Sequence, residues 1–119
     1  MALYIDGFLL PVPRRRLEAY RRMSAKAGKI WRELGALEYR ECVGDDLTKS
    51  AAPFKRAVRW KAGEAVVFSW IVYRSRAQRD RVVAKVMKDP RIMALGSGEE
   101  MPFDVRRMAY GGFRIVVDE

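Results

Sequence analysis

One stretch restricts the fold of this chain more than any other: residues 65–73, AVVFSWIVY, are hydrophobic at every position except Ser69. Val, Ile, Phe, Trp and Tyr are typical strand residues, so the stretch predicts a β-strand. A strand without alternating polar positions has both of its faces covered. The chain must therefore place a layer of structure, its own or a partner's, on each side of its sheet.

The flanking segments predict the order strand, helix, strand, strand, helix, strand. Apolar residues recur at helical spacing between Pro13 and Leu34, and Gly35 follows as a helix stop. Ser75 and Gln78 form a capping box that opens the second helix. The expected elements are, in chain order, a strand at 2–10, a helix at 13–34, strands at 36–44 and 65–73, a helix at 75–88 and a strand at 106–117.

Proline and glycine set several boundaries. Pro11 and Pro13 are expected to end the first strand. Gly111 and Gly112 indicate a bulge or a close approach within the last strand. Residues 54–60, FKRAVRW, are ambiguous and predict either a short strand or a loop arm.

The second helix has a predicted inner face and a predicted end. Asp89 and Pro90 should end the helix, with a further turn at 91–95 and a loop at 96–100 before the last strand. The residues expected to face inward are Val82, Val83, Val86 and Met87.

This order of elements is that of the ferredoxin-like α+β fold, βαββαβ, in which two helices cover one face of an antiparallel four-stranded sheet. We expect a single domain of this kind over residues 1–119. Two helices leave the other sheet face bare, although the strands place large apolar residues on both faces. The simplest cover is a second copy of the chain, sheet against sheet, in a homodimer. A monomer with an apolar ligand-binding face is the alternative.

Composition excludes several kinds of chemistry. The chain has no histidine, which removes His-based triads, His-ligated haem and nearly all catalytic zinc sites. Its carboxylates are scattered, so we expect no metal and no other cofactor. The single cysteine, Cys42, excludes an internal disulfide and suits a reducing cytoplasm. No basic region precedes an apolar run at the start, and no apolar stretch approaches the roughly 20 residues of a membrane span.

The net charge of +9 belongs to the expected helices. Residues 13–34 hold eight Lys or Arg against two Glu, and residues 75–88 hold five against one Asp, so the helices carry +10 and the rest of the chain −1. RNA-recognition domains of this topology stack bases on the sheet and place basic groups around it. Here the charge lies on the helical layer, and residues 65–73 lack the companion motif of such domains. Sheet-face RNA binding is therefore disfavoured. A basic helical face that binds RNA electrostatically stays open beside a merely solvated face.

A candidate site comes from polar residues on otherwise apolar strands. Tyr4, Asp6, Ser69, Tyr73 and Arg107 would form a small polar cluster in an aromatic cleft if they converge, with Asp6 as a base. We favour the alternative that Asp6 pairs with an arginine such as Arg107 and stabilises the dimer, because buried carboxylates need a partner.

Three more positions carry expectations. Asp104 and Tyr110 join the candidate ligand-binding residues, because they flank Arg107 at the entry to the last strand. Arg79 falls within the apolar stripe of the second helix. We expect it to pair with Asp104 or to lie at the edge of the helix.

Four segments together resemble one family. LYIDGF (3–8), VVFSW (66–70), DPR (89–91) and MPFDVRRMAYGGF (101–113) are similar to the YbaA-like family of uncharacterised bacterial proteins, over nearly the whole chain. That family resembles the dimeric α/β-barrel superfamily, which implies two ferredoxin-like sheets paired into a barrel. The superfamily includes cofactor-free oxygenases, isomerases and haem enzymes, so its fold does not determine a function. The absence of histidine excludes the haem branch. No catalytic residue is established for the family, so none is transferred.

Three classes of function stay open. The chain could be a cofactor-independent enzyme, a non-catalytic binder of a small apolar or aromatic metabolite, or an RNA-associated protein. We expect a cytoplasmic homodimer that holds such a metabolite in the cleft between sheet and helices.

Overall fold

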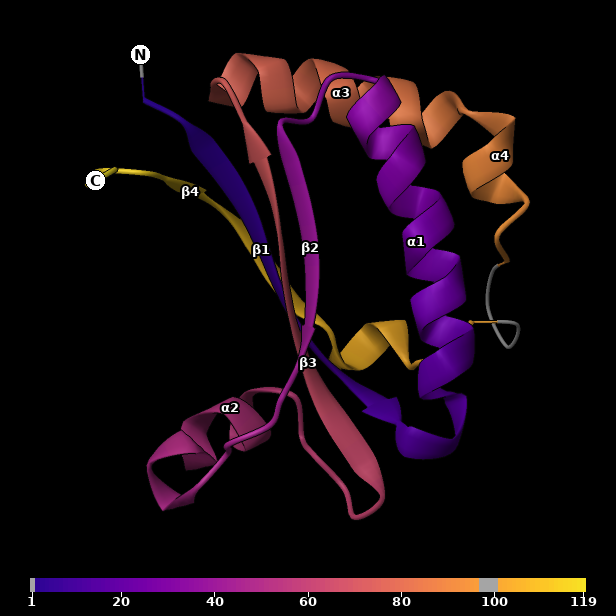
Figure 1. The fold of residues 1–119 in the computed structure, drawn as a ribbon, viewed down its shortest axis with the longest axis vertical. Coiled ribbons are helices and arrows are strands. Elements are labelled where there is room, and N and C mark those ends of the chain that lie inside the picture. Colours follow the sequence, from indigo (N-terminus) through magenta and orange to yellow (C-terminus); the bar gives the residue numbers. More distant parts are fainter. Residues whose placement is uncertain (1, 97–100) are drawn as a thin grey trace.

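The computed structural model describes residues 2–96 and 101–119 and confirms the ferredoxin-like α+β architecture (Figure 1). The loop expected at 96–100 lies, apart from Gly96, outside the described residues. The strands are β1 (Tyr4–Pro13), β2 (Glu38–Val43), β3 (Glu64–Tyr73) and β4 (Ala109–Arg114). The helices are α1 (Leu17–Glu33), α2 (Ala52–Ala57), α3 (Arg76–Lys88) and α4 (Pro90–Met93), with short 3-10 turns at Arg14–Arg16, Lys49–Ala51 and Val105–Arg107.

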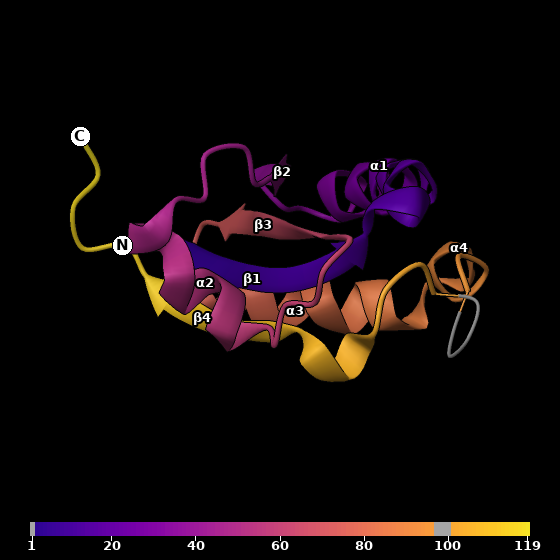
Figure 2. The ribbon, with the colours of Figure 1, turned by 90° about the horizontal axis from the view of Figure 1, so that it is seen from below.

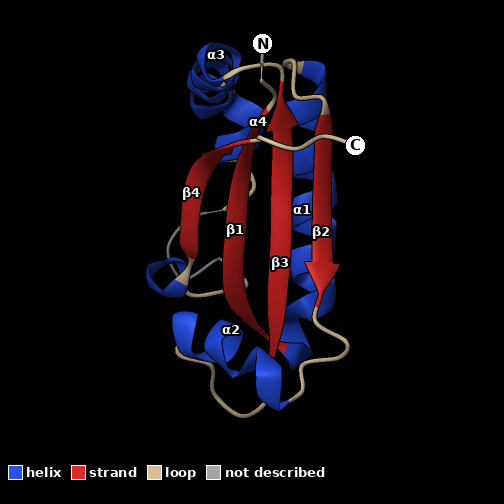
Figure 3. Cartoon of the chain, turned by 90° about the vertical axis from the view of Figure 1, so that its left-hand side faces the viewer, coloured by secondary structure: helices blue, strands red, loops and turns tan. Residues whose placement is uncertain are grey.

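The sheet is antiparallel with the strand order β2-β3-β1-β4. Helices α1 and α3 cover one of its faces (Figure 1). Figure 2 shows α2 and the C-terminal end on the other side of the sheet from α1 and α4. Seen from that side, α2 lies at one end of the sheet and leaves much of the face open (Figure 3). We call this side the open face.

Strand register assigns each side chain to one of the two faces. Tyr4 of β1 lies opposite Tyr73 of β3, and Leu10 lies opposite Val67. These four residues are buried against the helices, where each large apolar side chain contributes about 1.5–3 kcal/mol. The alternate residues point to the open face, and among them Phe68 is 46 % exposed.

The expectation that the first strand ends at residue 10, before Pro11, is wrong, although Pro13 is its last residue. β1 continues to Pro13 and pairs with β3 along its whole length. β4, however, pairs with β1 only as far as Leu9. Both prolines therefore lie where β1 has a single neighbour, so they remove no hydrogen bond to β4.

The expectation of a strand or loop arm at 54–60 is also wrong, because Ala52–Ala57 forms helix α2. Pro53 lies in the first turn, where its missing N–H costs no helical hydrogen bond. The helix holds Phe54 against Phe68, with 6.5 Å between ring centroids. Helix α2 has only six residues, which are too few to show the hydrophobic periodicity of a helix in the sequence.

The end of α1 and the start of α3 match the sequence analysis. Gly35 has a φ of 125° and ends α1, as expected. The Ser75 hydroxyl accepts a hydrogen bond from the Gln78 N–H at 3.1 Å and opens α3. The Gln78 amide in turn donates to the Gly35 carbonyl at 2.9 Å, so the two helix ends are linked.

The structure corrects two further predictions. Met87 does not face inward from α3, and the last strand is shorter than predicted. Val82 and Val86 are buried, but Met87 is 55 % exposed because it lies one residue, about 100° of helix, beyond Val86. The last strand covers 109–114 rather than 106–117. Residues before it form a 3-10 turn, which Asp104 caps by accepting the Arg106 N–H at 3.1 Å.

Candidate functional site

Asp6 is buried on the helix side of β1, and its partner comes from α3. The Arg79 Nη1 lies 2.6 Å from the Asp6 Oδ1, and the same guanidinium lies 5.0 Å from the ring centroid of Tyr4. The interpretation that Asp6 pairs with an arginine is confirmed, but the arginine is Arg79 and not Arg107. The expected pairing of Arg79 with Asp104 is wrong. An arginine within the apolar stripe of α3 is explained by the buried carboxylate beneath it.

Tyr73 completes this group at the end of the sheet. The Trp31 Nε1 donates to the Tyr73 hydroxyl at 3.0 Å. Burial raises the pKa of Tyr73, and the negative charge of Asp6 raises it further, so the phenol is neutral at physiological pH. Of the five residues of the hypothesised polar cluster, Tyr4, Asp6 and Tyr73 therefore lie together, and Arg79 joins them instead of Arg107.

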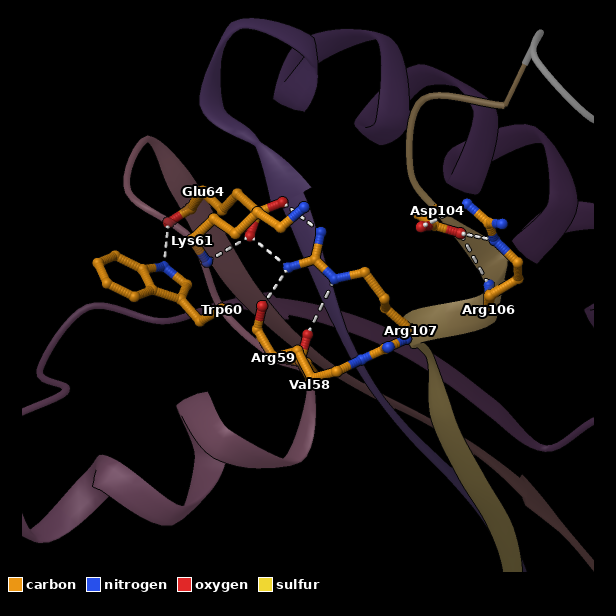
Figure 4. A network of polar contacts seen from close by, with 8 residues as sticks. All are labelled: Val58, Arg59, Trp60, Lys61, Glu64, Asp104, Arg106 and Arg107. Carbon is orange, nitrogen blue, oxygen red and sulfur yellow. Dashed lines mark hydrogen bonds and ion pairs between the residues drawn. The ribbon is translucent and has the colours of Figure 1, made fainter.

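Arg107 lies in a separate network that ties the turn before β4 to the start of β3 (Figure 4). Its guanidinium donates to both carboxylate oxygens of Glu64, at 2.7 and 2.6 Å. It also donates to the backbone carbonyls of Val58 and Arg59, at 3.2 and 2.6 Å. Both charged side chains are about nine-tenths buried, and the hydrogen bonds of Arg107 keep the pKa of Glu64 below its ordinary value. Four of the five N–H groups of Arg107 are used in these contacts, so we interpret the network as structural.

Asp104 and Tyr110 do not join either group. Asp104 pairs with Arg106 at 3.1 Å, a contact that lowers the pKa of its carboxyl group. The Tyr110 ring is stacked 6.0 Å from Phe8 and is 73 % exposed. Ser69 is also apart, because it lies opposite Phe8 in the register, further along the sheet.

A cavity of about 250 Å³ lies between the helix side of the sheet and the elements α1 and α4. We call it the aromatic cleft. Of the seven predicted site residues, only Ser69 lines it. Its apolar walls are Phe8, Leu10, Met23, Ala27, Trp31, Ile71, Ile92, Leu95, Met101, Phe103 and Met108, and its polar lining includes Tyr20, Ser24, Tyr39, Glu41 and Ser69.

Glu41 is the acidic group of the aromatic cleft. It lies on β2 directly opposite Ser69 of β3 and is half-buried. The Tyr20 hydroxyl donates to one carboxylate oxygen at 2.7 Å, and the Tyr39 hydroxyl donates to the other at 3.0 Å. The carboxylate is thus held from both sides, by a tyrosine of α1 and a tyrosine of its own strand.

Both tyrosines are donors and not acids in this arrangement. Burial raises the pKa of Tyr20 and of Tyr39, and the negative charge of Glu41 raises both further. The phenols stay protonated at neutral pH, so each keeps a hydrogen to donate. Tyr20 is in addition held edge-on by Phe103, with 5.5 Å between ring centroids.

The sequence analysis did not assign Glu41 to a site. In the strand predicted at 36–44, Glu38 and Arg40 alternate with apolar residues, and Glu41 follows Arg40 directly. Its position opposite Ser69 depends on the register of β2 against β3, and its tyrosine partner on α1 is 21 residues away. The available signal was that Glu41 breaks this alternation, which places a carboxylate on the same strand face as Tyr39 and Val43.

Residues 2–96 and 101–119 hold neither a metal-binding cluster nor a helix suited to a membrane. This part of the chain contains no group of three or more His, Cys, Asp or Glu placed to hold a metal ion. None of its helices combines the length and the apolar character needed to cross a membrane.

The fold is similar to that of solved structures that share little sequence with this chain. A dimeric ferredoxin-like protein from an uncultured marine organism superposes with a TM-score of 0.60 over 100 % of both chains, at 12 % identity. Rv0793 from Mycobacterium tuberculosis superposes with a TM-score of 0.51 over 100 % of this chain and 98 % of its own, at 18 % identity. These likenesses define a ferredoxin-like protein.

The family follows from sequence. The model of the family described as "Protein of unknown function (DUF1428)" matches residues 3–105, and the chain belongs to this family. The uncharacterized protein YbaA of Escherichia coli (strain K12) is 45 % identical over 117 residues, which cover 98 % of each chain. YbaA of Shigella flexneri matches to the same extent. The resemblance to YbaA-like proteins is confirmed.

Proposed function

We propose that the protein binds a small apolar or aromatic metabolite in the aromatic cleft. The observation that carries the proposal is the pairing of an apolar cavity with one fixed acidic group, Glu41, held by Tyr20 and Tyr39. Ligand sites of proteins are typically apolar concavities with a few placed polar groups that orient the ligand. The cavity of about 250 Å³ holds roughly eight water volumes at ~30 Å³ each, so the ligand is small.

We also propose that the protein acts as a homodimer joined through the open face. Phe54, Phe68 and Phe113 leave 43 %, 46 % and 60 % of their surface exposed, an apolar area that a second copy would cover. The marine protein with the same fold is described as dimeric, which supports this arrangement. The aromatic cleft lies on the other side of the sheet, so dimer formation leaves it accessible. The single cysteine, Cys42, favours a cytoplasmic location.

The test of the cleft is a ligand screen with a variant that fills the cavity. Thermal shift against quinones, phenols, amines and other small metabolites should give binders, whose affinities are then measured by calorimetry. Ala27 lines the cleft from α1, so Ala27→Leu should abolish their binding. Ala19→Leu makes the same change on the exposed side of α1 and should leave affinity unchanged. Binding that survives Ala27→Leu would place the ligand elsewhere. Turnover of a binder would make the protein an enzyme.

RNA association through the basic helical face is the second candidate. Its support is the charge of +10 on residues 13–34 and 75–88 of a chain whose net charge is +9. Binding of this kind weakens steeply with salt because it depends on counterion release. Charge reversal at Arg21 and Arg22 should then remove RNA binding and leave metabolite binding intact. RNA binding that neither salt nor charge reversal at Arg21 and Arg22 weakens would exclude the basic helical face as the RNA-binding site.

A further inference from the structure

Glu41 differs from every other carboxylate that the described residues bury or half-bury. Asp6 is paired with Arg79 and Glu64 with Arg107, at 2.6 Å in both cases. The half-buried carboxylates outside the core follow the same rule, with arginine partners for Glu38, Asp89 and Asp104. Among the side chains described within residues 2–48, 50–96 and 101–119, Glu41 alone of these carboxylates has no Lys or Arg partner.

This difference is pronounced because the chain is rich in cations, with 24 Lys and Arg against 15 Asp and Glu. Arg40, the cation nearest to Glu41 in sequence, also lines the cleft, but it lies opposite Trp70 in the register and pairs with Glu38 at 3.4 Å. The donors that Glu41 does receive are two neutral phenols. They satisfy hydrogen bonds but do not neutralise the charge.

An ionised carboxylate has room for about four hydrogen-bond donors, two on each oxygen. Tyr20 and Tyr39 use one site on each oxygen, so about two sites stay available on a carboxylate that lines the cleft. A half-buried negative charge beside an apolar cavity is most strongly stabilised by a cation that also donates hydrogen bonds. A protonated amine has both properties.

We propose that the ligand of the aromatic cleft is a small aromatic amine, bound as a cation with its ammonium group on Glu41 and its apolar body against the walls. This proposal rests on the proposed function and names the ligand class for it. Trp31, Tyr39 and Phe103 line the same cavity, and aromatic rings attract an ammonium group through their π faces as well as packing on an apolar body. The tyrosine hydroxyls prevent Glu41 from turning away, because each holds a different oxygen.

Three probes that share a phenyl body and differ in charge test the proposal in the wild-type protein. They are 2-phenylethylamine as the cation, 2-phenylethanol as the neutral match and 3-phenylpropionate as the anion. Calorimetry at pH 7 should show the amine binding at least tenfold more tightly than the alcohol, which corresponds to 1.4 kcal/mol. The propionate should bind most weakly, since it approaches Glu41 with a like charge.

Substitution then assigns the preference to one side chain. Glu41→Gln removes the charge with little change in shape and should bring amine and alcohol affinities to within about twofold of each other. Glu38→Gln is the matched control, because it removes a carboxylate from the same strand on the open face. It should leave the tenfold preference intact. Thermal denaturation of both variants verifies that they are folded.

The outcomes separate this inference from the proposed function. Equal binding of amine and alcohol to the wild-type protein, or a preference that Glu41→Gln leaves unchanged, would overturn the amine assignment while the cleft remains a ligand site. Absence of binding by all three probes would count against both proposals. Because the comparison of probes uses the wild-type protein, it stands even if Glu41→Gln does not fold.

Discussion

The ring of Tyr39 lies directly on Gly28 of α1, so close that a β-carbon at Gly28 would come within 2.7 Å of the ring. The missing side chain lets β2 approach α1 and brings the Tyr39 hydroxyl to Glu41. A glycine in the middle of a helix costs about 1 kcal/mol of helix propensity, and here the contact with Tyr39 explains why one is present.

Gly28→Ala should therefore destabilise the protein although alanine favours helices. Overpacking costs about 1–3 kcal/mol, which exceeds the gain in propensity. Urea denaturation measures the change in free energy of unfolding. Lys29→Ala, at an exposed neighbouring position, should change it by less than about 0.5 kcal/mol. A more stable Gly28→Ala variant would mean that Tyr39 does not rest on α1 in this way.

Arg107→Met should unfold the protein at much lower urea concentration. The substitution leaves Glu64 buried without its partner and removes the donors to the carbonyls of Val58 and Arg59. Breaking a buried ion pair costs about 3–5 kcal/mol. Arg106→Met is the control, because its side chain is 85 % exposed, and we expect less than about 1 kcal/mol from it. Similar decreases in the free energy of unfolding of the two variants would contradict a structural role that is specific to Arg107.

Low pH should reduce the free energy of unfolding of the wild-type protein, partly through protonation of Glu64. Arg107 lowers the pKa of Glu64 in the folded state, so this contribution is fully present above the ordinary value of 4.5 and is lost as the pH falls through the lowered pKa. Glu64→Gln removes the titrating group. The slope of unfolding free energy against pH below 4.5 should thus be shallower in Glu64→Gln than in the wild type. Parallel slopes would show that Glu64 does not titrate with folding.

Phe68→Glu should convert the proposed dimer to a monomer. Phe68 lies in the middle of the open face, and a charge there would be buried unpaired between two sheets. Light scattering should give about twice 13.7 kDa for the wild type and 13.7 kDa for the variant. Met87→Glu, on the exposed side of α3, should stay dimeric. A wild-type mass of 13.7 kDa would exclude the sheet-to-sheet dimer.

The order of elements could be predicted from sequence because each main element carries its own period or cap. The hydrophobic run of β3, interrupted only by Ser69, and the capping residue Ser75 are local signals, and each was sufficient to predict its element. Pro11 did not end β1 as predicted, because a proline is tolerated where β4 no longer pairs with β1, and no local pattern encodes that point. Helix α2 escaped prediction because six residues show no period.

The candidate site was harder to predict because its residues meet only through tertiary contacts. An arginine partner for Asp6 could be inferred from the cost of burying a carboxylate, but the choice of Arg79 depends on how α3 crosses the sheet. Glu41 needed the register of β2, the position of Tyr20 on α1 and the approach that Gly28 permits. None of these is a property of a single segment.

The fluorescence of Trp31 tests ligand binding in the cleft most directly. Trp31 lines the cavity, whereas Trp60 lies beside the start of β3 with its indole N–H on the Glu64 carbonyl, and Trp70 points to the open face. A Trp60→Phe, Trp70→Phe variant leaves Trp31 as its only tryptophan. Titration with 2-phenylethylamine should change the Trp31 emission saturably, with the same dissociation constant as calorimetry. Binding that calorimetry detects and that leaves the Trp31 emission unchanged would contradict a ligand site in the aromatic cleft.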